Sequence, residues 1–187
     1  MSAVYVLPLG DLQEDIVGTV DRGIRQIFDL EVRRLSPVQT PGYAYDTTRG
    51  QYSSELILRN IIKRYPSEAL RLLAVTDVDL FIPMLTFVYG QAQLNGKVSV
   101  VSTARMHQEF YTLTRKRPLT LSRVYKESVH ELGHTFGLTH CSVPSCPMSI
   151  ATGIEQLDAK GDALCSGCKH LLRDALAGIP RRYYEQH

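Results

Sequence analysis

The segment from His130 to Cys168 holds the residues whose types and spacing could do chemistry. It reads H-E-L-G-H-T-F-G-L-T-H-C-S-V-P-S-C-P-M, then sixteen residues, then C-S-G-C. Three of the chain's six histidines and all four of its cysteines lie here. Imidazole and thiolate are common zinc ligands in proteins, and their number is enough for two separate metal sites.

The first potential site is the run H-E-x-x-H-x-x-G-x-x-H. On an α-helix each residue advances about 100°, so His134 lies about 40° round from His130 and both imidazoles can reach one ion. Glu131 falls near the ion but angled away from it, where a carboxylate serves as general base for a zinc-bound water. Gly137 can turn left-handed and end the helix, which would return His140 as third ligand. Three neutral imidazoles and one open position describe a catalytic zinc site, with amide-bond hydrolysis as the reaction class.

The second potential site consists of four cysteines in two pairs, separated by eighteen residues: Cys141, Cys146, Cys165 and Cys168. Four thiolates make a closed tetrahedral cage, as in structural zinc sites. Iron could also occupy such a cage, and the cysteines could instead be free thiols or form two disulfides. Because Cys141 directly follows His140, we expect loss of this metal to loosen the first site as well.

Composition limits the class of protein. A chain of 187 residues is most simply one domain, and a hydrophobic fraction of 44% with 21% charged residues is ordinary for a globular protein. A net charge of +2 is too mild to indicate a nucleic-acid or membrane partner. No apolar run could span a bilayer, and nothing in Met1 to Leu12 marks the chain for secretion. We therefore expect a cytoplasmic monomer whose cysteines stay reduced, which favours metal ligation over disulfides.

Hydrophobic periodicity predicts the elements that must position these residues. Strands are expected at residues 4–7, 31–35, 72–75 and 78–82, and helices at residues 12–27, 53–64, 120–136 and 170–177. Asp11 and Glu14 resemble a capping box for the first helix. Asn95-Gly96 predicts a hairpin with a two-residue turn between residues 86–94 and 97–103. From residue 138 to Cys168 we expect a stretch without regular structure, organised by metal.

The order of elements predicts the fold class. Strand, helix, strand, helix, strand indicates a partly parallel sheet, and the hairpin adds antiparallel strands at its edge. The class is therefore α+β with an α/β-like mixed sheet and packed helices. One of these helices, at residues 120–136, would carry the first two histidines.

The zinc motif, followed by a methionine in a tight turn, resembles the metzincin clan of metallopeptidases. Within the clan, Cys141, Cys146, Met148 and the C-S-G-C run resemble the archaemetzincins, and V-T-D-V-D-L-F-I-P at residues 75–83 is also similar. The resemblance implies one catalytic domain in two parts. An N-terminal subdomain, residues 1–137, would hold a twisted mixed sheet and the active-site helix. A C-terminal subdomain, residues 138–187, would hold the Met-turn and the four-cysteine zinc.

The resemblance also implies roles for individual residues. It carries over His130, His134 and His140 as zinc ligands, Glu131 as the base, and Met148 as a packing residue beneath the histidines. Ile150 stands where several metzincins have a tyrosine that assists at the metal.

The resulting hypothesis is a zinc peptidase with two zinc ions per chain that cleaves peptides or flexible protein segments. Peptidases of this type often bind extended substrate by adding a strand to a sheet edge, here expected at residues 97–103. One competing hypothesis is a catalytically silent, zinc-stabilised interaction module, which would have no need of Glu131. Another is a hydrolase of a non-peptide amide.

Overall fold

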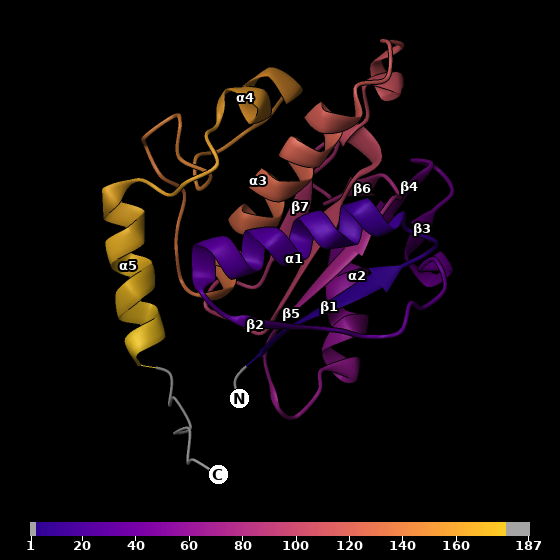
Figure 1. The fold of residues 1–187 in the computed structure, drawn as a ribbon. Helices are drawn as coiled ribbons and strands as arrows, with labels where there is room; N and C mark the ends of the chain where they lie inside the picture. Colours follow the sequence, from indigo (N-terminus) through magenta and orange to yellow (C-terminus); the bar gives the residue numbers. More distant parts are fainter. Residues whose placement is uncertain (1–2, 179–187) are drawn as a thin grey trace.

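Five strands form the main sheet in the computed structural model, which describes residues 3–178 (Figure 1). In spatial order they are β2 (Glu31–Arg34), β1 (Ala3–Leu9), β5 (Ala69–Thr76), β8 (Val98–Ser102) and β7 (Gly90–Ala92). The first four are parallel and β7 runs antiparallel to β8 at the edge, which confirms the predicted partly parallel sheet. A second, small sheet joins β3 (Tyr45–Asp46), β4 (Gln51–Ser53) and β6 (Leu80–Phe81).

Helices cover both faces of the main sheet because side chains alternate along its strands. Val4 and Val6 of β1 share a hydrophobic cluster with the long helices α1 and α3, whereas Tyr5 and Leu7 share another with α2. The result is three layers (Figure 1). The α-helices are α1 (Glu14–Phe28), α2 (Ser54–Ile61), α3 (Arg117–Thr135), α4 (Ile154–Ala159) and α5 (Ser166–Ala177). Short 3₁₀ turns are η1 (Gly42–Ala44), η2 (Ile62–Arg64), η3 (Ala104–Met106) and η4 (Gln108–Tyr111).

The N-terminus of α2 matches the cap that its local sequence indicates, whereas the N-terminus of α1 does not. Ser53 caps α2 as an N-cap should, since its side chain accepts a hydrogen bond from Leu56 N. The predicted capping box at Asp11 is wrong, because α1 begins at Glu14 and its N-cap is Gln13, without a side-chain hydrogen bond.

Within residues 3–178, no helix has the length and apolar character needed to cross a membrane.

The hairpin keeps its predicted register but not its two-residue turn. Ala92 pairs with Ser99, and Gln93 N donates to Val98 O at 3.0 Å, so the loop spans residues 94–97. Asn95 N donates instead to His134 O at 2.8 Å, at the end of α3. β8 lies inside the sheet, between β5 and β7, so the expectation that residues 97–103 offer the free edge is wrong. β7 is the strand at this edge, and β2 forms the opposite edge of the sheet.

The C-terminal segment packs against α3. Leu157, Leu164 and Leu172 belong to the same hydrophobic cluster as Val124 and Leu132 of α3. The expectation of an irregular stretch up to Cys168 is wrong in part, because α4 lies within it. This helix is six residues long, too short to show a helical period in the sequence. The division at residue 137 stays a prediction, and residues 179–187 of the C-terminal part lie outside the described residues.

Candidate active site

Helix α3 and the turn after it bring the three predicted histidines together. His130 and His134 are one turn apart, with ring centroids 4.5 Å from each other. The His140 ring lies 5.3 Å from that of His130 and 5.0 Å from that of His134. The ligand atoms of all three lie within 4.8 Å of one another. One ion could therefore contact all three imidazoles.

The turn that returns His140 is a Schellman motif around Gly137, whose φ is 89°. Gly137 N donates to His134 O at 2.9 Å, and Leu138 N donates to Gly133 O at 3.1 Å. The carbonyl oxygen of Leu138 then lies 2.7 Å from Nδ1 of His134. The turn therefore ends the helix and also orients one of the imidazoles, as a left-handed glycine allows.

The hydrogen bonds of His130 and His134 to backbone oxygens use Nδ1 and leave Nε2 available to bind a metal. Nδ1 of His130 lies 2.8 Å from Pro147 O, and Nδ1 of His134 lies 2.7 Å from Leu138 O. Carbonyl oxygens only accept, so both Nδ1 atoms carry the hydrogen and both Nε2 atoms present lone pairs. These Nε2 atoms are 3.0 Å apart. Tetrahedral zinc with Zn–N bonds of about 2.0–2.1 Å separates neighbouring nitrogens by about 3.3 Å, so the donor set fits zinc.

The environment keeps the histidines neutral, as metal binding requires. Burial, with a smaller contribution from the Lys160 charge, lowers the pKa of His130 well below its ordinary value. Burial likewise lowers the pKa values of His134 and His140. The three side chains thus bind a cation without first losing protons at neutral pH.

Glu131 lies buried between α3 and the edge strand β7. A Cβ atom at Gly90 of β7 would lie only 2.5 Å from Glu131 Cγ, so the missing side chain leaves the space that Glu131 fills. Burial, and the neighbouring charge of Glu127, raise the pKa of Glu131 well above its ordinary value. A divalent cation beside this carboxyl would favour its charged form. Such a carboxyl can both accept and return a proton.

The predictions from the sequence did not include three residues that lie at the site. Glu127 is buried one turn before Glu131, and its spacing of four residues could have revealed it. Gly90 and Lys160 are far from the motif in the chain, and no local pattern indicates them. Lys160 is 3% exposed, and its Nζ donates to Pro147 O at 3.1 Å.

Met148 lies beneath the turn of α3 that carries the histidines. Its side chain is fully buried, and its sulfur is 2.6 Å from the position of a Cβ at Gly133, between His130 and His134. Its carbonyl oxygen accepts a hydrogen bond from Cys141 N at 2.9 Å. Ile150 is 59% exposed and offers no polar group to the site.

The four cysteines converge with their sulfur atoms within 4.8 Å of one another. Sγ of Cys141 and Sγ of Cys165 are 3.7 Å apart, far beyond the roughly 2.05 Å of a disulfide. Tetrahedral zinc with Zn–S bonds of about 2.3 Å would place sulfurs about 3.8 Å apart. The Cys168 amide donates to Cys165 Sγ and lowers the pKa of that thiol to about 7. This hydrogen bond stabilises the thiolate of Cys165, the form that binds metal, whereas burial raises the pKa values of Cys146 and Cys168.

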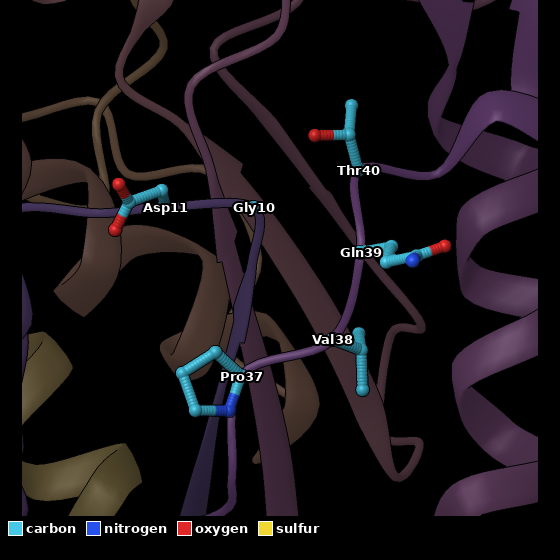
Figure 2. A pocket seen from close by; sticks show the side chains of 6 residues that line it. All are labelled: Gly10, Asp11, Pro37, Val38, Gln39 and Thr40. Atoms are coloured by element: carbon cyan, nitrogen blue, oxygen red, sulfur yellow. The ribbon is translucent and has the colours of Figure 1, made fainter.

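A cavity of about 600 Å³ opens at the carboxyl end of β1 (Figure 2), lined by Gly10, Asp11, Pro37, Val38, Gln39 and Thr40. Figure 2 shows the Asp11 and Gln39 side chains pointing in opposite directions. The lining has no histidine or cysteine. The metal-binding side chains that converge are instead the three histidines and the four cysteines.

Comparison with known proteins gives one consistent family. Residues 16–174 match the model of peptidase family M54. The chain is 34% identical over 171 residues to an archaemetzincin of Methanocaldococcus jannaschii, across 91% of this chain and 93% of that protein. The crystal structure of an archaemetzincin from Methanopyrus kandleri superposes with a TM-score of 0.82 at 34% identity, over 94% of this chain and 96% of the other. A zinc-dependent peptidase from Methanocorpusculum labreanum gives a TM-score of 0.83 at 25% identity, over 91% and 100%.

Proposed function

We propose that Glu131 is the general base of this chain, which belongs to peptidase family M54, the archaemetzincins. The chain is a zinc-dependent metallopeptidase. The proposal assigns His130, His134 and His140 as the ligands of the catalytic zinc. The observation that carries it is that the Nε2 atoms of His130 and His134, each with a lone pair, lie 3.0 Å apart, and that Glu131, next to His130 in the chain, is buried. Without a cation between them, two such lone pairs repel.

Glu131 has two tasks in this mechanism. It accepts a proton from the attacking water and donates it to the leaving amine of the cleaved peptide. Zinc, when bound, supplies the Lewis acidity that lowers the pKa of water to about 7 and polarises the substrate carbonyl. The carbonyl oxygens of Pro147 and Leu138 hold the imidazoles of His130 and His134 in place. Gly90 leaves Glu131 room to face the cleavage position.

Extended peptide segments are the substrate form that the edge strand supports. Tyr89 O accepts from Ser102 N, and Gln93 N donates to Val98 O, so alternate residues of β7 face β8. The backbone groups of Gly90 and Ala92 therefore face away from the sheet. A substrate strand paired to them would pass beside Glu131, because Gly90 adjoins it. This geometry favours peptides and flexible protein segments.

The four cysteines are proposed to hold a second, structural zinc that braces the C-terminal subdomain, residues 138–187. The tetrahedral spacing of the sulfurs supports this assignment. Both metal sites draw all their ligands from one chain, which supports a monomer. A cage of thiolates also needs reducing conditions, which supports a cytoplasmic location.

The test is cleavage of a peptide library by zinc-loaded protein, with Glu131→Gln as the matched control. Removing the base should reduce turnover by about 10²- to 10⁴-fold. The variant should still hold two zinc ions per chain, because none of the proposed ligands is changed. Cleavage at the wild-type rate by Glu131→Gln would show that the general-base assignment is wrong. Fewer than two ions per wild-type chain would contradict the two-site model.

A further inference from the structure

Lys160 is a buried cation at the junction of the two metal sites. It follows α4, is 3% exposed, and its Nζ donates to Pro147 O at 3.1 Å. Taking an ammonium group out of water is costly unless it is paired and hydrogen-bonded. Its negative partner is Glu127, whose Oε2 lies 3.9 Å from Nζ. One hydrogen bond and one ion pair therefore hold this ammonium group.

The oxygen that Lys160 contacts is also the one that orients a proposed zinc ligand. Pro147 O lies 2.8 Å from Nδ1 of His130. Pro147 stands between Cys146 of the cysteine cage and the buried Met148. A carbonyl oxygen has two lone pairs, so it can accept from both donors at once. One backbone oxygen thus joins the catalytic imidazole, a buried ammonium and the loop of the second metal site.

We propose that Lys160 is a positioning residue for the catalytic metal centre. Its ammonium group fixes Pro147 O, and that oxygen in turn fixes the ring of His130. Glu127 anchors Lys160 from α3, so the helix that carries His130 and Glu131 is joined by charge to the C-terminal segment. The inference rests on the proposed role of His130 as a ligand. Lys160 itself does not touch the substrate.

Lys126 provides a matched control. It is also a buried lysine, 5% exposed, and its Nζ donates to backbone oxygens of the same segment, Asp158 O at 3.0 Å and Leu157 O at 3.4 Å. None of these contacts involves Pro147. Replacing either lysine with methionine removes one buried charge and its bonds to the C-terminal segment, but only Lys160→Met frees the oxygen that holds His130.

The experiment compares Lys160→Met and Lys126→Met in the full chain. Zinc release to a chelator reports the hold on each ion, and the visible spectrum of the cobalt-loaded protein reports the geometry of the histidine site. Loss of a group that orients a ligand commonly weakens metal affinity by about 10- to 100-fold. We expect that loss at the histidine site of Lys160→Met, with a changed cobalt spectrum, lower kcat and little change in KM. Lys126→Met should lower Tm and leave these properties unchanged.

Wild-type zinc release and cobalt spectrum in Lys160→Met would overturn the proposal, and so would equal effects in Lys126→Met. If Lys160→Met does not fold, Glu127→Gln serves as the second variant, because it keeps the side-chain size and removes the anchor charge. It should speed zinc release in the same direction, and an unchanged rate would overturn the proposal. Failure of the general-base assignment would appear separately, as activity in Glu131→Gln, because zinc release does not depend on that base.

Discussion

Gly90→Ala should impair catalysis while leaving the metal in place. The added Cβ would lie 2.5 Å from Cγ and 2.9 Å from Cδ of Glu131, whereas ordinary contact begins at 3.4 Å. The carboxylate side chain must therefore retreat by about 0.9 Å, the difference between 3.4 and 2.5 Å. A misplacement of about 1 Å can cost about 100-fold in rate. We expect kcat to fall by about 100-fold, which corresponds to about 2.7 kcal/mol in the barrier.

The assay measures kcat and KM on a reporter peptide, together with zinc content and thermal unfolding. Gly42→Ala is the matched control, because a Cβ there meets nothing within 4 Å. The Cβ at residue 90 would also lie 2.7 Å from Val100 O, so the unfolding curve is needed to show that β7 stays paired. Gly42→Ala should behave as the wild type in every measurement.

A double variant shows whether the effect passes through Glu131. If it does, Gly90→Ala should add little to the loss already caused by Glu131→Gln, because no base remains to be displaced. A full further loss of about 100-fold would place the effect on the strand or the substrate instead. Wild-type kcat in Gly90→Ala alone would refute the argument from the close contact.

Two further predictions concern metal loss and pH. Cys165→Ser should release the cysteine-bound ion and also weaken the histidine site, because Cys141 N holds the carbonyl of Met148 at 2.9 Å; metal content and activity measured together check this, and an unchanged catalytic site would rule out the coupling. The metal-free protein should be most stable in mild acid. Burial lowers the pKa of His130, so stability is lost as pH falls below about 6.5, where the unfolded chain binds more protons. Burial raises the pKa of Glu131, so the contribution of this group to stability is lost as pH rises above about 4.3. In urea unfolding, Glu131→Gln should therefore flatten the decline in stability toward higher pH and leave the decline toward lower pH unchanged. Identical pH profiles for the variant and the wild type would count against this assignment.

Most of the secondary structure could be predicted because strands and long helices leave a period in the sequence. The parallel strands, α1, α2 and α3 all lie where that period indicates. The errors have physical causes. The six residues of α4 are too few to show a period, and at the hairpin loop Asn95 N donates to His134 O, a contact that the local sequence does not indicate. The spacing of residues along a short segment predicts neither the strand order of a sheet nor a contact between residues 39 apart, such as Asn95 and His134.

By itself, the sequence determined the chemistry that the protein could perform. The spacing of His130 and His134 follows from helix geometry, and Gly137 is the residue that permits the turn to His140. The two pairs of cysteines likewise indicate a closed cage through their number and spacing alone. These are local constraints, so the order of residues is enough to state them.

Tertiary structure decided how those groups are held and tuned. Only the folded chain places Gly90 against Glu131, and only folding brings Lys160 and the His130 imidazole to the same carbonyl oxygen. Burial, which moves the pKa values at the site, is also a property of the assembled layers. The reason is that packing joins residues far apart in the chain, and no short pattern records which of them will meet.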